Sequence, residues 1–76
     1  MVRLPRISGK DMVRFLEREG FTLLRIRGSH HYMASGEIHL SVPVHGNESL
    51  RIGTLRSLLR DMNMSPTEFE QKLTEM

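Results

Sequence analysis

The side chains that change protonation nearest neutral pH lie in one stretch of the chain. All four histidines, His30, His31, His39 and His45, fall within residues 30–45 of the 76-residue sequence. Neighbouring strand residues point to opposite faces, so His30 and His31 cannot both face one site if they lie in a strand. This stretch therefore contains the groups able to exchange protons at cellular pH, although any one of these histidines could equally be an ordinary surface or structural residue.

A metal site is one alternative for these histidines. If the strands that carry them pair, three imidazoles could converge and hold zinc. However, the sequence has no His-x-His pair and no His-Glu-x-x-His segment, and only Glu37 and Glu48 are near enough to orient a ligand. Cysteine is absent, which removes thiolate ligands, and we expect neither a metal nor another cofactor. Serine-hydrolase catalysis is disfavoured too, because Ser29 lacks the glycine-rich elbow that exposes such a nucleophile. The discounted zinc ligands are His31, His39 and His45.

The charges are unevenly distributed along the chain. Residues 1–36 carry seven Lys or Arg against three Asp or Glu, whereas residues 65–76 carry one Lys against three Glu. Most of the cations are arginine, whose planar guanidinium suits two-pronged contact with phosphate. The basic first half favours a nucleic acid as partner, and a solvated surface with ordinary ion pairs is the alternative.

The length bounds the architecture, because 76 residues with 38% hydrophobic content can form only one small core. We expect a single domain over residues 1–76. No stretch approaches the roughly 20 apolar residues of a membrane span. The sequence therefore predicts a soluble cytoplasmic protein that does not enter a membrane.

Capping residues and hydrophobic periodicity predict three helices. Ser8 begins a helix over residues 9–19 that Gly20 ends. Apolar residues at positions 55, 58, 59 and 62 predict a second helix that starts between residues 51 and 54. Ser65 caps a third helix of about eleven residues, whose thin apolar stripe includes Phe69 and Met76.

Alternating patterns and turn residues predict three strands between the first two helices. The first runs from Phe21 to the turn at 27–29, and Leu24 and Ile26 share one face of what reads as a half-buried strand. The others span residues 30–34 and 38–42. The order α-β-β-β-α-α predicts an α+β fold, in which helices pack on one face of a three-stranded antiparallel sheet. The other face and the sheet edge stay free for RNA or another chain.

Six short segments, one of them a single arginine, are spread along the chain. On these motifs the sequence resembles HicA-type toxins of bacterial and archaeal toxin–antitoxin systems over residues 4–69. One departure is Ile52, where family members often have proline before Gly-Thr-Leu. The matching segments are Gly20-Phe21, Arg25, Gly28-Ser29-His30-His31, Val42-Pro43-Val44-His45, Gly53-Thr54-Leu55-Arg56 and Ser65-Pro66-Thr67-Glu68-Phe69-Glu70.

The resemblance implies a fold like that of double-stranded-RNA-binding domains. It also implies a metal-independent endoribonuclease that cleaves mRNA and arrests translation and growth. A HicB-type antitoxin would neutralise it in an oligomeric complex. In that family the catalytic histidine directly follows Gly-Ser or Gly-Gly, which corresponds to His30 as general base or acid.

RNA cleavage by an internal 2′-hydroxyl needs a base, an acid and positive charge around the phosphate. An imidazole of ordinary pKa, about 6.5, can serve as that base. Arg25 and Arg27 precede His30 on one hairpin, where Gly28 allows close approach of the RNA and the turn exposes His30 at the sheet edge. Ser29 could orient the imidazole or a phosphate oxygen. The remaining candidates are Lys10, Arg56 and Arg60 for phosphate, Tyr32 for base stacking, and His31 and His45 as auxiliary groups.

Two alternatives from other functional classes remain open on sequence alone. A non-catalytic double-stranded RNA-binding module would use the same fold and cations without needing His30. An interaction protein would use its exposed sheet to recruit a partner and would have no affinity for RNA.

Overall fold

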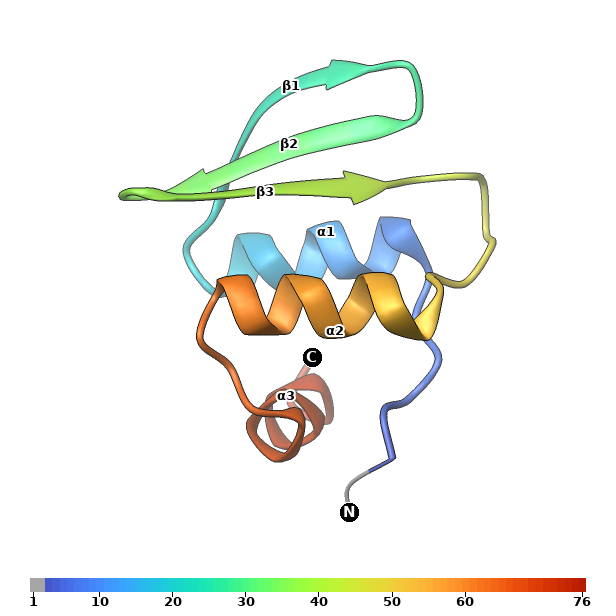
Figure 1. Ribbon diagram of the computed structural model, residues 1–76, viewed down its shortest axis with the longest axis vertical. Coiled ribbons are helices and arrows are strands. Elements are labelled where there is room, and N and C mark those ends of the chain that lie inside the picture. Colours follow the sequence, from blue (N-terminus) through green and yellow to red (C-terminus); the bar gives the residue numbers. More distant parts are fainter. Residues whose placement is uncertain (1–2) are drawn as a thin grey trace.

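A computed structural model describes residues 3–76, and its elements form three layers (Figure 1). The sheet forms one layer, α1 and α2 lie side by side beneath it, and α3 lies on their far side. This arrangement confirms the expected α+β fold of the double-stranded-RNA-binding type. None of the helices in residues 3–76 has the length and apolar character needed to cross a membrane. The elements are α1 (Gly9–Arg18), β1 (Thr22–Arg27), β2 (His30–Ser35), β3 (Ile38–Pro43), α2 (Ile52–Asp61) and α3 (Pro66–Leu73).

The sheet is antiparallel in the order β1-β2-β3, so β2 is the central strand. Residues that pair across antiparallel strands share a face, and alternate residues along a strand point to the same face. Met33 pairs with Leu23 and Leu40, and both Met33 and Leu40 are buried. This row faces the helices. The side chains of His30 and Tyr32 consequently point away from the helices, toward solvent.

One apolar core joins the layers. The buried stripe of α1 and that of α2 pack against the inner face of the sheet. On the other side of the helices, the rings of Phe15 and Phe69 meet edge to face with centroids 4.9 Å apart, which fixes α3 to α1. The largest fully buried side chains are Phe15, Phe69, Met12, Leu16, Met33, Leu55, Leu59 and Val42.

The predicted helix caps are present. The Ser8 hydroxyl accepts a hydrogen bond from the Asp11 backbone N–H at 3.1 Å, and the Ser65 hydroxyl accepts one from Glu68 at 3.1 Å. Gly20, which follows α1, has φ of 97°, a conformation that favours glycine. α2 begins at Ile52, inside the predicted range, although its first turn has no side-chain cap.

Two expectations about the elements are wrong. All six residues of β1 are exposed, so the strand is not half-buried. It is an edge strand, and of the two helices beneath the sheet α1 contacts it while α2 packs against β3. A register shift between Leu23 and Arg25 places Leu24 in a bulge, so Ile26 shares a face with Leu23 instead. α3 has eight residues rather than about eleven, because the helix ends at Leu73 with Thr74 as its C-cap, and Met76 is exposed beyond it.

Candidate nucleic-acid interface and active site

The outer face of the sheet gathers polar and cationic side chains from all three strands. One cross-strand row pairs Tyr32 with Arg25 and with Ser41, and the adjacent row pairs His30 with Arg27. Tyr32 is half-buried, whereas the other four are exposed. We call these five residues, Arg25, Arg27, His30, Tyr32 and Ser41, the outer-face cluster.

His30 is the only histidine of this cluster. Its Nδ1 lies 3.3 Å from the Ser41 hydroxyl oxygen, and its ring centroid lies 6.4 Å from that of Tyr32. The sequence placed His30 at the sheet edge, but β2 is the central strand. His30 is exposed because it is the first residue of that strand and points away from the helices.

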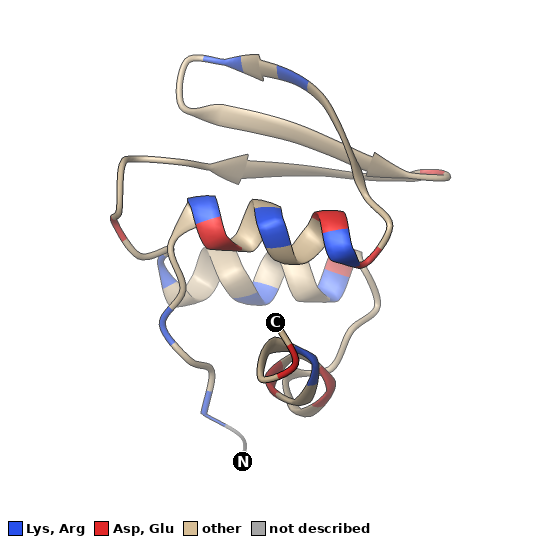
Figure 2. Cartoon of the chain, turned by 180° about the vertical axis from the view of Figure 1, so that it is seen from behind, with Lys and Arg blue, Asp and Glu red and all other residues tan. Residues whose placement is uncertain are grey.

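Arg25 and Tyr32 form the second contact within the cluster. The guanidinium carbon of Arg25 lies 4.6 Å from the centre of the Tyr32 ring, within the range of a cation–π interaction. Within residues 3–76, no carboxylate forms an ion pair with Arg25 or Arg27. Figure 2 shows the positive charge on β1 at one end of the molecule and acidic residues in α3 at the other. The cluster therefore presents positive charge and an aromatic ring beside an imidazole.

The turn before His30 is fixed by the backbone. Gly28 has φ of 56°, a left-handed conformation that a residue with a Cβ adopts at a cost. The Ser29 carbonyl accepts a 2.7 Å hydrogen bond from the Val44 N–H, which ties the β1–β2 turn to the chain leaving β3. At the same end of the molecule, Gly9 packs so tightly against the Pro43 carbonyl oxygen that a Cβ would overlap it. These contacts tie the turn before His30 to the end of β3, and the end of β3 to the start of α1.

The other three histidines lie elsewhere. His31 points toward the helices between Ile26 and Val42, and its Nδ1 is buried with no hydrogen-bond partner among the described residues. His39 pairs with Ala34 toward the far end of the outer face, and His45 lies exposed in the loop after β3. Residues 3–76 contain no group of three side chains able to hold a metal ion. Because His31 and His39 face opposite sides of the sheet, the three-histidine zinc alternative has no geometric support.

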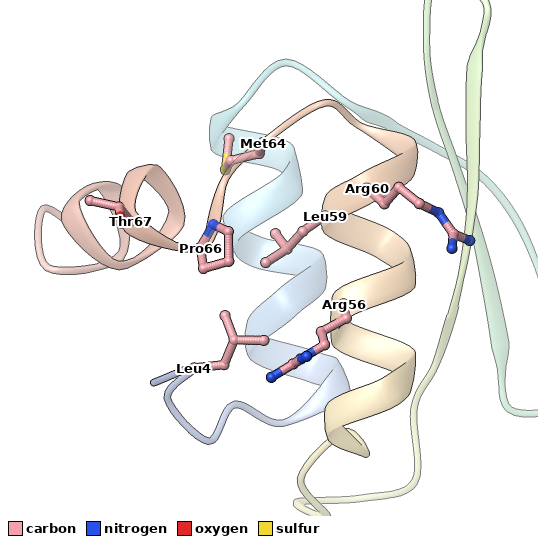
Figure 3. A pocket seen from close by; sticks show the side chains of 7 residues that line it. All are labelled: Leu4, Arg56, Leu59, Arg60, Met64, Pro66 and Thr67. Atoms are coloured by element: carbon pink, nitrogen blue, oxygen red, sulfur yellow. The ribbon is translucent and has the colours of Figure 1, made fainter. Parts of the chain in front are cut away.

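Three further candidates for phosphate contact lie in the helical layer. Lys10 is exposed in the first turn of α1. Arg56 and Arg60 extend from α2 in different directions and line a cleft of about 440 Å³ (Figure 3). The structure does not bring these three residues into the outer-face cluster, so their contact with RNA stays a prediction. The other residues that line the cleft are Leu4, Leu59, Met64, Pro66 and Thr67.

Sequence reasoning missed Ser41 and Gly9. Ser41 lies eleven residues from His30, and only the pairing of β2 with β3 brings its hydroxyl to the imidazole. The alternating pattern of residues 38–42 showed which side chains share a face, but not which residues of β2 they would lie beside. The contact of Gly9 with Pro43 could not be predicted, because one glycine after a helix cap does not show which strand end will pack against it.

Comparison with known proteins places the sequence that forms this site in a family. A family model described as HicA toxin of bacterial toxin-antitoxin matches residues 9–64, which run from the first residue of α1 past the end of α2. The chain belongs to the HicA toxin family. Membership confirms the resemblance found in the motifs, and it supports a toxin role with an antitoxin as partner. A search of curated proteins found no match.

The matched segment contains the whole outer-face cluster and the turn that precedes His30. It ends at Met64, before α3. The HicA family pattern therefore covers the sheet and the two helices that support it, while α3 completes the core of this chain through Phe69.

Proposed function

We propose that this HicA-family toxin is a metal-independent endoribonuclease that cuts mRNA on the outer face of its sheet and thereby inhibits translation and growth. The observation that carries the proposal is the outer-face cluster. It combines an exposed imidazole, two arginines with no carboxylate partner among residues 3–76 and an aromatic ring. These are the groups that phosphodiester cleavage and single-strand binding require.

The proposed reaction is an internal transesterification. A base removes the proton of a ribose 2′-hydroxyl, and the 2′-oxygen attacks the adjacent phosphorus. The bond from phosphorus to the 5′-oxygen breaks, and an acid protonates that oxygen. The products are a 2′,3′-cyclic phosphate and a 5′-hydroxyl. His30 acts as general base or acid, and no electron transfer or added co-reactant is needed.

Arg25 and Arg27 supply the positive charge. A cation beside the phosphate stabilises the charge that develops as the 2′-oxygen attacks. Gly28 leaves space for the RNA backbone at the turn, and nothing lies within 4 Å of where its Cβ would be. Tyr32 offers a ring on which a nucleobase can stack, and the Arg25 guanidinium lies over that ring. Ser29, His31 and His45 remain candidates for auxiliary roles.

The proposed regulator is a HicB-type antitoxin. A protein that covers the outer-face cluster would block RNA from His30, and acidic groups on it would pair with Arg25 and Arg27. We expect toxin and antitoxin to form an oligomeric complex in which cleavage is suppressed.

The direct test is cleavage of a long single-stranded RNA by the purified protein in the presence of EDTA. We expect wild type to cut it and His30→Ala to lose about 100-fold or more of the rate, the usual scale of acid–base catalysis. His39→Ala is the matched control, because His39 is an exposed histidine on the same face, four pairing positions along β3 from the partner of His30. It should cut at the wild-type rate.

The outcomes separate the candidate functions. RNA binding without cleavage by both wild type and His30→Ala would contradict the enzyme and leave a non-catalytic RNA-binding module. Failure to bind RNA at low salt would instead favour a pure interaction protein. In a binding assay, Arg25→Ala should reduce the slope of log affinity against log salt concentration by about one, the value expected for the loss of one phosphate contact.

A further inference from the structure

We propose that Ser41 is a positioning residue for His30, a role that rests on the proposed ribonuclease function. In this proposal the Ser41 hydroxyl accepts a hydrogen bond from Nδ1–H of the imidazole. That bond holds the ring in the tautomer whose unprotonated Nε2 faces the RNA.

The geometry supports a direct contact between these two side chains. Ser41 Oγ lies 3.3 Å from His30 Nδ1, and the contact joins two strands at residues eleven positions apart. Ser41 pairs with Tyr32, two residues along β2 from His30, and both side chains lie on the outer face. With Nδ1 directed at Ser41, the other ring nitrogen, Nε2, is the one left for substrate.

The chemistry of a hydroxyl suits a histidine that must pass a proton. When His30 acts as base, Nε2 must carry a lone pair, so the single proton of the neutral ring belongs on Nδ1. After Nε2 takes the 2′-hydroxyl proton, Nδ1–H still donates to Ser41. The bond thus persists in both protonation states. A neutral partner of this kind orients the ring without adding the negative charge that a carboxylate would bring.

The surroundings of Ser41 also suit a positioning role. Ser41 is exposed and belongs to no core cluster, so its hydroxyl contributes little to folding. Within the outer-face cluster, it is the only side chain in hydrogen-bond contact with His30. Among the described residues, Tyr32 makes no hydrogen bond to His30, and the two rings lie with their centroids 6.4 Å apart.

Kinetics of three Ser41 variants and one control test the proposal. Ser41→Ala should lower kcat by about 3- to 10-fold, the scale of one hydrogen bond, and leave KM within about 2-fold. Ser41→Thr keeps a hydroxyl and should restore most of the rate. Ser41→Asp should move the acid limb of the pH–rate profile to higher pH, because a carboxylate favours the imidazolium. Thr22→Ala, an exposed substitution at the far end of the same face, should match wild type.

A second measurement does not depend on cleavage. Nitrogen-15 NMR of the His30 ring in the free protein should show Nδ1 protonated in the neutral form, with the population shifting toward Nε2–H in Ser41→Ala. An unchanged tautomer together with an unchanged kcat would overturn the proposal. A rise in KM alone would mean that Ser41 touches RNA rather than His30. If wild type cuts no RNA, the proposed function fails, and the NMR result still decides whether Ser41 sets the His30 tautomer.

Discussion

The two faces of the sheet differ sharply although they share the same strands. On β2, Met33 and His31 face the helices, and Met33 is fully buried. Their neighbours Tyr32 and His30 face solvent and contact Arg25 and Ser41. Alternation along one strand thus separates the residues that stabilise the fold from those that can meet a substrate. Substitutions on the inner face should change stability, whereas those on the outer face should change activity.

The strongest test of this comparison replaces one residue on each face. Met33→Ala should lower the free energy of unfolding by about 2–5 kcal/mol, because it leaves a cavity in a core with little apolar surface to spare. Tyr32→Ala, one position away on the outer face, should cost about 1 kcal/mol or less, mainly through its contact with Arg25. Urea unfolding followed by circular dichroism measures both. Equal losses would contradict the division between the faces.

Gly9 tests how tightly the helical layer holds the end of β3. Gly9→Ala should destabilise the protein by about 1–3 kcal/mol, since the added methyl would overlap the Pro43 carbonyl oxygen. Gly53→Ala is the matched control in α2, where nothing lies within 4 Å of the new Cβ and alanine is the better helix former. It should be neutral or stabilise by up to about 1 kcal/mol. Thermal unfolding of the two variants gives the comparison, and a neutral Gly9→Ala would mean that β3 can move aside.

The smallest expected effect concerns the one inner-face histidine. His31 Nδ1 is buried without a hydrogen-bond partner among residues 3–76. A buried polar atom without a partner lowers the free energy of unfolding. His31→Leu should therefore raise the free energy of unfolding by about 1 kcal/mol, with the new side chain packing between Ile26 and Val42. His39→Gln, on the outer face, should change it by less than about 0.5 kcal/mol. A loss of stability in His31→Leu would show that the imidazole makes a favourable contact.

Local chemistry made the elements predictable. Ser8 and Ser65 announce helix starts because their hydroxyls satisfy free backbone N–H groups, and Gly20 ends a helix because it adopts positive φ. β1 was harder, because the pattern of residues 21–27 contains no sign of the bulge at Leu24 or of α2 packing against β3 at the other side of the sheet. Exposure of an edge strand depends on what covers it, and that is not a local property.

The candidate site divides in the same way. His30 and the preceding arginines stand within a few residues of one another, so one hairpin places Arg25, Arg27 and His30 together whatever the rest of the chain does. Whether Lys10, Arg56 and Arg60 reach that hairpin depends on how the helices pack, and the structure has them in the other layer.

By itself, the sequence determined the order of the elements, the family and the opposite orientation of His30 and His31, because caps, turns, motifs and strand alternation act between near neighbours. Only the tertiary structure decided that Ser41 meets His30, that Gly9 closes on Pro43 and that β1 stays uncovered. These contacts depend on strand register and layer packing, which arise when distant segments bury one shared core.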